Sequence, residues 1–166
     1  MSNQAAEAAN DVAAAGAALM VHASAVVVGE TGILIRGRSG AGKSSLALCL
    51  LAAAGQRGRF ARLVGDDRVE LVGRNSRVVA SGHPAVLGMI ETRGQGIMRL
   101  DYESAVVVGL VVDLLPAEEL VRYPDFEARH VGICGAKLPR LALLSDRSSY
   151  DCAHLVMAHL QHAEIN

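Results

Sequence analysis

The chain has 166 residues, which suits one compact domain, and 51% of them are hydrophobic, enough apolar material to build one core. Its formal net charge is −1 and its 16 basic residues are scattered, which argues against a nucleic-acid partner. The sequence shows neither a membrane-length apolar run nor a secretory signal, and its three widely spaced cysteines fit neither a disulfide framework nor a zinc site. We therefore expect a cytoplasmic protein with no membrane partner.

The N-terminal quarter predicts a tail followed by a hairpin. Residues 1–20 are rich in alanine and lack apolar periodicity, so we expect a frayed tail or short helix there, ahead of one folded domain over residues 21–166. Two apolar runs, Ala25–Val28 and Ile33–Ile35, flank residues 29–32, which have the composition of a tight turn. These runs predict an antiparallel hairpin.

A buried helix and several short strands are expected next. Residues 43–54 are apolar nearly all round and stop at Gly55, a residue suited to the position after a helix. Strand character returns at residues 62–64, 69–72 and 76–80. The first of these strands ends at a pair of acidic residues.

The second half of the chain contains one clear strand and one clear helix. Residues 84–90 predict a short helix opened by its proline, and residues 91–100, interrupted by glycines, predict a functional loop. Residues 105–115 are almost continuously apolar and β-branched, as in a central strand buried on both faces. Residues 116–144 predict loops, and a capping-box pattern at residues 148–151 predicts a C-terminal amphipathic helix.

A phosphate-binding pattern joins the predicted hairpin to the first helix. It fits G-x-x-x-x-G-K-[ST], in which glycines let backbone N–H groups converge on phosphates at the start of a helix. Lys43 then reaches the terminal phosphates and Ser44 offers a hydroxyl to Mg²⁺. The nucleotide-binding residues predicted from the pattern are Gly37, Arg38, Ser39, Gly40, Ala41, Gly42, Lys43 and Ser44.

Other polar residues supply the groups that phosphoryl transfer needs. Asp66 and Asp67 follow a strand, so that one carboxylate can bind a metal or water while its neighbour accepts a proton, although adjacent acids at a turn are also common without function. Glu91 and Arg93 lie among glycines and suit a metal and a phosphate respectively. His22 lies near the phosphates or simply caps the sheet edge.

Four motifs in this order resemble the catalytic domain of HPr kinase/phosphorylase. The resemblance covers residues 22 to about 115 and becomes thin beyond residue 116. It implies an α/β domain of the phosphoenolpyruvate carboxykinase-like P-loop type, with a mixed sheet and flanking helices. The motifs are His22, Gly37 to Ser44, Asp66-Asp67-Arg68-Val69 and Glu91-Thr92-Arg93-Gly94-Gln95-Gly96-Ile97.

The resemblance also assigns roles to residues. It implies a kinase that uses ATP and Mg²⁺ to phosphorylate a serine of an HPr-like phosphocarrier, and it implies a homo-oligomer, a hexamer in the family. Asp67 would be the base for the acceptor serine, with His22 tuning it, and Glu91 would join Ser44 at Mg²⁺. Arg93 would support the phosphates, and Arg122 would match an arginine on the far side of the site.

Some positions depart from the family pattern. The chain begins almost at the catalytic domain, so we expect the N-terminal domain of longer members to be absent. Residues 139–147 are shortened and lack a glycine relative to the family's loop, which argues against reverse phosphorolysis, and Thr92 and Gln95 replace apolar residues. Two other functions stay open: a nucleotide-binding regulatory module without kinase activity, and a same-fold kinase for another protein or a small hydroxylated molecule.

Overall fold

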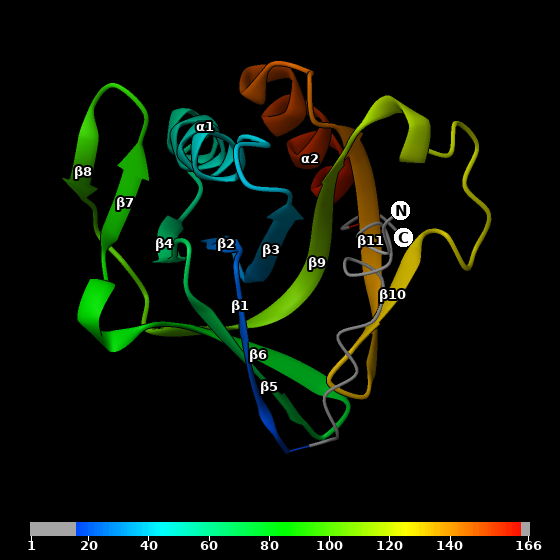
Figure 1. The fold of residues 1–166 in the computed structure, drawn as a ribbon, viewed down its shortest axis with the longest axis horizontal. Coiled ribbons are helices and arrows are strands. Elements are labelled where there is room, and N and C mark those ends of the chain that lie inside the picture. Colours follow the sequence, from blue (N-terminus) through cyan, green and yellow to red (C-terminus); the bar gives the residue numbers. More distant parts are fainter. Residues whose placement is uncertain (1–15, 164–166) are drawn as a thin grey trace, which may run out of the picture.

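The protein is described by a computed structural model over residues 16–163, built around a nine-stranded mixed sheet (Figure 1). The sheet order is β1-β5-β6-β9-β3-β2-β4, with β11 also beside β9 and β10 beside β11. These strands are β1 (Ala18–Val21), β2 (Ser24–Val28), β3 (Thr31–Gly37), β4 (Ala61–Gly65), β5 (Val69–Arg74), β6 (Arg77–Gly82), β9 (Ala105–Leu115), β10 (His130–Ile133) and β11 (Ala136–Leu144).

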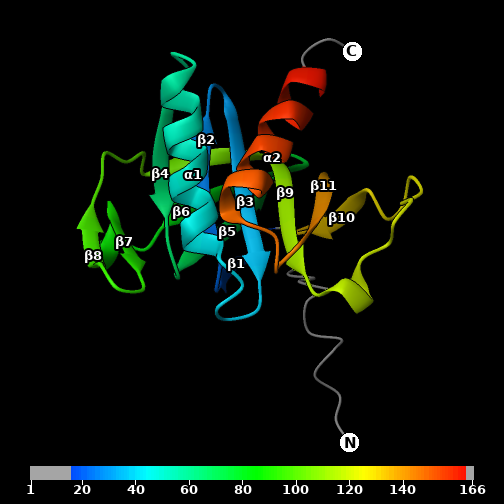
Figure 2. The same ribbon diagram turned by 90° about the horizontal axis from the view of Figure 1, so that it is seen from above.

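Within the described residues, the remaining elements are two α-helices, a separate hairpin and two 3₁₀ turns. The α-helices lie side by side over one face of the sheet, and the hairpin lies beside β4 (Figures 1 and 2). The mixed sheet with flanking helices confirms the predicted fold class. The elements are α1 (Lys43–Gln56), α2 (Ser149–Ala163), β7 (Met89–Thr92), β8 (Gly96–Arg99), η1 (Pro84–Val86) and η2 (Ala117–Glu119).

The predicted hairpin is present as β2 and β3, which pair antiparallel with Val28 opposite Thr31. Its connection is therefore only Gly29 and Glu30, and Gly29 takes a φ of 60°, which suits a residue without Cβ. The two faces of β2 contribute to different cores. Val26 and Val28 pack under the helices, whereas Ala25 and Val27 pack in a second cluster on the opposite face.

Strand β9 has the predicted bounds and links the two parts of the sheet. Its first residues pair antiparallel with β6, and its later residues pair parallel with both β3 and β11. Only that later part, which has strands on both sides and cores on both faces, is almost fully buried. The parallel pairs keep the end of β9 beside the end of β3, where the glycine-rich loop begins.

The end of α1 differs from the prediction. The helix continues through Gly55 to Gln56, and the left-handed conformation belongs to Gly58, with a φ of 65°. The chain turns there because the N–H of Arg59 donates to the carbonyl of Ala54 at 2.9 Å. The prediction that the helix stops at Gly55 was therefore wrong, because this glycine lies inside the last helical turn.

Residues 84–100 also differ. The proline opens only the three-residue turn η1, and Met89 begins a strand instead of continuing a helix. The expected loop over 91–100 is largely the hairpin β7–β8, in which Thr92 pairs with Gly96. The glycines serve a tight connection at the hairpin tip, where Gly94 has a φ of 87°.

The loops expected over residues 116–144 are in part wrong, because residues 130–133 and 136–144 form β10 and β11. At the other end, residues 18–20 belong to β1, paired with β5, and not to a tail or helix. Residues 1–15 lie outside the described part of the chain. Neither of the two described α-helices combines the length and apolar character needed to span a bilayer.

Candidate active site

One edge of the sheet gathers most of the predicted site residues. Strands β3 and β4 both run antiparallel to β2, so they run parallel to each other and end at the edge where β2 begins. The glycine-rich loop follows β3, Asp66 and Asp67 follow β4, and His22 precedes β2. Strand order thus brings together residues that are far apart in the sequence, at the carboxyl ends where α/β sheets bind ligands.

The loop after β3 has the backbone of an anion-binding site. Gly40 and Gly42 take φ values of 79° and 93°, which a residue with Cβ rarely adopts. Gly42 caps α1 without any side-chain hydrogen bond, and the first turn of the helix contains no acidic residue. The N–H groups of this turn and the positive end of the helix dipole are therefore available to phosphates.

Lys43 folds back onto this loop. Its Nζ donates to the carbonyl oxygens of Gly37 at 3.0 Å and Arg38 at 3.1 Å, and the residue is only 6% exposed. Burial lowers the pKa of Lys43, while the nearby carboxylates of Asp67 and Asp66 act in the opposite direction. The ammonium group is thus held at the loop by neutral acceptors that phosphate oxygens can replace.

Asp66 is a buried carboxylate surrounded by donors. Its Oδ1 accepts hydrogen bonds from Ser24 Oγ at 2.5 Å and Ser44 Oγ at 3.0 Å, and its Oδ2 lies 3.0 Å from the same Ser44 hydroxyl. The backbone N–H of Glu91 donates to Oδ2 at 3.3 Å. Asp66 therefore ties the start of α1 to the start of β2 and to β7.

Asp67 is about half exposed although its neighbour Asp66 is buried, and the backbone turns sharply at this pair. The N–H of Arg68 donates to the carbonyl of Asp66 at 2.7 Å, and Asp67 has a φ of 63°. A three-residue turn with positive φ is strained for a residue with Cβ, and such strain often marks functional positions. His22 Nε2 lies 3.0 Å from Asp67 Oδ1, and both side chains are about half exposed.

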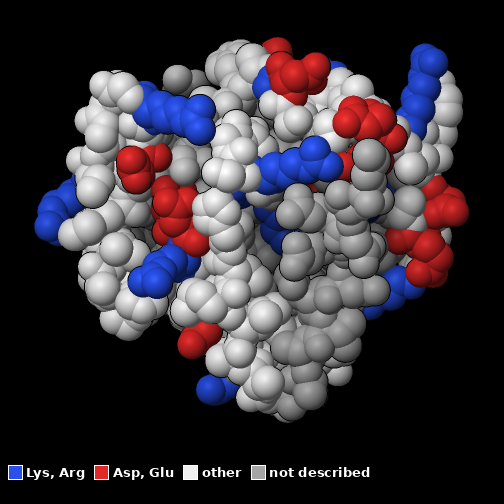
Figure 3. Space-filling model, in the orientation of Figure 1, with Lys and Arg blue, Asp and Glu red and all other residues white. Residues whose placement is uncertain are grey.

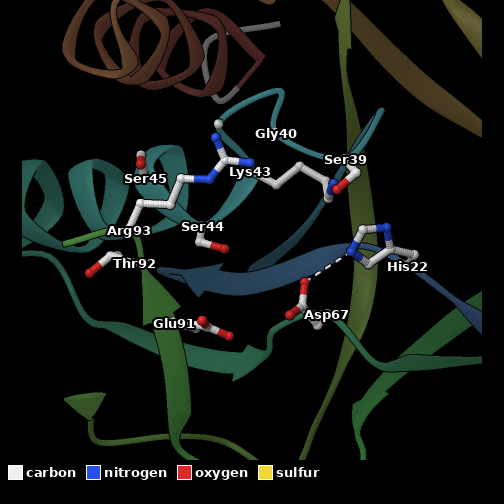
Figure 4. Close-up of a pocket in the computed structure, with 11 residues that line it drawn as sticks. His22, Ser39, Gly40, Lys43, Ser44, Ser45, Asp67, Glu91, Thr92 and Arg93 are labelled. Atoms are coloured by element: carbon white, nitrogen blue, oxygen red, sulfur yellow. Dashed lines mark hydrogen bonds and ion pairs between the residues drawn. The ribbon is translucent and has the colours of Figure 1, made fainter. Parts of the chain in front are cut away.

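These residues surround one pocket of about 420 Å³ (Figure 4). Glu91 lies below the loop on β7, and Arg93 extends across the pocket towards the glycine-rich loop. A Cβ added to Gly40 would stand 3.2 Å from the guanidinium of Arg93, so this glycine permits the close approach. The pocket is lined by His22, Ser39, Gly40, Gly42, Lys43, Ser44, Ser45, Asp67, Glu91, Thr92 and Arg93.

The oxygen donors fit a hard divalent cation that also binds phosphate. Ser44 and Glu91 line the pocket and offer a hydroxyl and a carboxylate, the ligand types that Mg²⁺ takes together with substrate phosphates. Asp66, predicted as a further metal ligand, does not line the pocket, and its carboxylate is buried and already accepts hydrogen bonds. No cluster of three or more His, Cys, Asp or Glu residues able to hold a metal occurs within residues 16–163. A cation held here would accordingly complete its coordination with nucleotide oxygens and water.

Two of the predicted residues have other surroundings. Arg122 does not line this pocket. Its guanidinium lies 5.4 Å from the ring centre of Tyr123, and the residue lines a separate, mainly apolar pocket. Arg38, although in the loop, directs its side chain outward to the carboxylate of Glu119 on η2, at 2.5 Å. Gly37, Ala41 and Asp66 are also not among the residues that line the pocket.

A buried ion cluster lies directly under the loop. Asp113 on β9 is 4% exposed and accepts two hydrogen bonds from Arg36, each 2.8 Å long, and a third from Arg140 at 2.5 Å. Burial raises the pKa of Asp113, but the two arginines outweigh it, so the pKa lies below its usual value. This cluster joins β3, β9 and β11 next to Gly37.

Sequence reasoning missed Ser24 and Asp113. Both are polar residues in otherwise apolar strands, Ser24 at the start of β2 and Asp113 within β9, which is the one local signal that either offers. The two arginines that contact Asp113 lie 77 and 27 residues away from it in the sequence, and Ser24 lies 42 residues from Asp66. Only the order of the strands reveals these contacts.

Fold and site together define an α/β domain of the P-loop type whose glycine-rich loop faces acidic side chains from two further strands. Comparison with known proteins then gives the family. The model of the HPr serine kinase C-terminal domain matches residues 14–143, and the chain belongs to this family.

Individual relatives agree. The chain is 36% identical over 133 residues to the HPr kinase/phosphorylase of Chloroherpeton thalassium, covering 74% of this chain and 37% of that protein. It is 40% identical over 110 residues to the enzyme of the same name from Lactobacillus delbrueckii, covering 66% and 32% respectively. The chain thus spans about a third of the length of the curated relatives that it matches.

A solved structure has the same fold. The structure titled as the Hpr(Ser) kinase/phosphatase from Coxiella burnetii superimposes with a TM-score of 0.70 at 25% sequence identity. The match covers 88% of this chain and 99% of that chain. The two chains therefore share their overall fold over most of their lengths.

Proposed function

We propose that this chain is an ATP- and Mg²⁺-dependent kinase that phosphorylates a serine of an HPr-like phosphocarrier protein. The observation that carries the proposal is the single pocket that brings Lys43, Ser44, Asp67 and Glu91 together. The family, and the names of relatives that are called HPr kinases, supply the acceptor. The glycine-rich loop from Gly37 to Ser44, taken alone, would leave hydrolysis, switching and phosphoryl transfer equally open.

The loop holds the nucleotide. The backbone N–H groups at the start of α1 bind phosphate oxygens, and Lys43 exchanges the carbonyls of Gly37 and Arg38 for the terminal phosphates. Arg93, which already reaches over Gly40, places a second positive charge on the same group. Ser44 and Glu91 would hold Mg²⁺, which neutralises charge on the phosphates during transfer.

Asp67 prepares the acceptor. A serine hydroxyl is a weak nucleophile, and a carboxylate within hydrogen-bond reach can take its proton as the new P–O bond forms. Asp67 suits this role because it is half exposed at the pocket rim, whereas Asp66 is buried and already bonded to several donors. His22 orients Asp67 through the contact at 3.0 Å.

A transfer assay tests the proposal. The protein is incubated with labelled ATP, Mg²⁺ and the HPr protein of the same organism, and label on a serine is measured. Wild type is expected to transfer label and Lys43→Ala to lose transfer. Lys137→Ala, which removes an exposed lysine paired with Glu127, serves as the matched control and is expected to retain transfer.

Other outcomes of this assay support the two alternative functions. Nucleotide binding without transfer to any phosphocarrier would mark a regulatory module. Preferential phosphorylation of another protein or of a small hydroxylated metabolite would mark a same-fold kinase with a different acceptor. A pocket containing both a candidate base and the loop lysine favours transfer over binding alone, because a binding module needs no base.

Reverse phosphorolysis and assembly stay predictions. Most of the stretch that the sequence suggested as a shortened loop, residues 139–147, belongs to strand β11, which ends at Leu144. We therefore propose the forward reaction alone, the transfer from ATP to a serine. The predicted role of Arg122 is a separate point, and it requires that the segment of residues 116–129 approaches the pocket. A homo-oligomer, a hexamer by the resemblance, is testable by light scattering.

A further inference from the structure

Ser24 is a buried hydroxyl at the start of an otherwise apolar strand. Strand β2 reads Ser-Ala-Val-Val-Val, and every one of its residues is buried. Ser24 itself is 0% exposed and does not line the pocket. A hydroxyl buried this deeply costs folding free energy unless it has a hydrogen-bond partner, so the partner of Ser24 is important for its role.

That contact is with Asp66. Ala25 pairs with Gly65 across β2 and β4, and one step further the antiparallel register sets Ser24 beside Asp66. The Ser24 hydroxyl donates to Oδ1 of Asp66 at 2.5 Å. Ser24, which does not line the pocket, therefore holds the carboxylate of Asp66 in place.

The orientation of Asp66 controls the orientation of Ser44. The hydroxyl of Ser44 lies 3.0 Å from both oxygens of Asp66, and it has a single proton to donate. When that proton points to Asp66, the lone pairs of the hydroxyl face away from the carboxylate and are free to bind a cation. Rotation of the Asp66 carboxylate would therefore reorient the Ser44 hydroxyl that is hydrogen-bonded to it.

We propose that Ser24 is a positioning residue for the Mg²⁺ site, acting through Asp66 on Ser44. This role rests on the proposed function, since it concerns the cation that accompanies the nucleotide. The hydrogen bonds to the Asp66 carboxylate within residues 16–163 come from Ser24, Ser44 and the N–H of Glu91. Ser24 alone among these three residues lies outside the pocket lining, so it orients the carboxylate without contacting the nucleotide.

Metal binding to the nucleotide complex tests the role directly. ADP affinity is measured by calorimetry with and without Mg²⁺, and Mn²⁺ binding to the ADP complex by electron paramagnetic resonance. Ser24→Ala is expected to weaken Mn²⁺ binding about ten-fold, as for other residues that orient metal ligands. ADP affinity without metal is expected to stay within about two-fold of wild type, since the loop is untouched.

Val26→Ala is the matched control. Val26 lies two residues along β2, is also 0% exposed and packs in the core under the helices. Its truncation is expected to lower stability at least as much as Ser24→Ala while leaving Mn²⁺ affinity unchanged. If Ser24→Ala unfolds at the assay temperature, Ser24→Cys preserves the volume with a weaker donor and is expected to change Mn²⁺ affinity in the same direction.

Two results would overturn the role. If Ser24→Ala binds Mn²⁺ as tightly as wild type, the positioning role of Ser24 is rejected and the kinase proposal stays intact. If Val26→Ala loses as much Mn²⁺ affinity as Ser24→Ala, the loss reflects general destabilisation and not positioning. Failure of the wild-type protein to bind ADP with metal is a different result. It rejects the kinase proposal itself, and the positioning role falls with it.

Discussion

His22 Nε2 lies 3.0 Å from Asp67 Oδ1, although the two residues are 45 positions apart and come from the start of β2 and the end of β4. Both side chains are about half exposed at the rim of the pocket. Of the two adjacent aspartates, Asp67 lines the pocket and Asp66 is buried, so we propose that His22 orients the carboxylate that would take the proton of an acceptor hydroxyl.

Asp67→Asn is expected to lower kcat by a factor of about 10² or more, because the amide cannot accept the serine proton. ADP affinity should stay within a few-fold of wild type, since the loop contacts persist. Steady-state transfer to HPr together with calorimetry measures both. Asp101→Asn, at an exposed position, is the control and should behave like wild type.

His22→Ala is expected to lower kcat about ten-fold, less than the loss of Asp67, because His22 acts through that carboxylate. A double-mutant cycle separates this from an independent role. In the Asp67→Asn background, removal of His22 should cause little further loss. Fully multiplicative losses would show that His22 does not act through Asp67.

Gly40→Ala is expected to weaken nucleotide binding and to destabilise the protein by about 1 kcal/mol, because the φ of 79° strains a residue with Cβ and the new methyl meets Arg93. Gly55→Ala is the matched control. Gly55 lies inside α1, and nothing stands within 4 Å of an added Cβ. This second variant should gain about 0.5–1 kcal/mol and bind ADP normally, as measured by thermal unfolding and calorimetry.

Asp113→Asn is expected to cost about 3 kcal/mol at neutral pH, since it leaves the guanidinium groups of Arg36 and Arg140 without their carboxylate. Because the folded pKa of Asp113 lies below its ordinary value of 3.8, its contribution is complete above that value and lost as pH falls through the folded pKa. Denaturant unfolding of both proteins between about pH 3 and pH 7 measures the difference. A stability difference that stays constant down to the lowest pH would contradict this account.

Local sequence patterns predicted those parts of the fold whose partners are near in the chain. The hairpin of β2 and β3 and the apolar strand β9 followed from apolar runs and turn composition. Strand β11 was missed because Pro139 and the charges of Lys137 and Arg140 interrupt its pattern. It is stabilised by parallel pairing with β9, a non-local contact that no local pattern reveals.

The candidate site was also only partly predictable from local sequence patterns. The loop from Gly37 to Ser44 was recognisable because its glycines and lysine lie at fixed spacing. The convergence of His22, Asp67 and Glu91 on it required either the family resemblance or the strand order. The hydrogen bond from Ser24 to Asp66 depends on a register between β2 and β4 that the sequence does not specify locally.

The most direct test of the central claim is mass spectrometry of the HPr protein after incubation with ATP, Mg²⁺ and this chain. We predict one added phosphoryl group on a single serine with wild type, strongly reduced phosphorylation with Asp67→Asn, and none with Lys43→Ala. HPr that stays unmodified with wild type, or that is modified equally with Lys43→Ala, would contradict the assignment of the pocket as a kinase site.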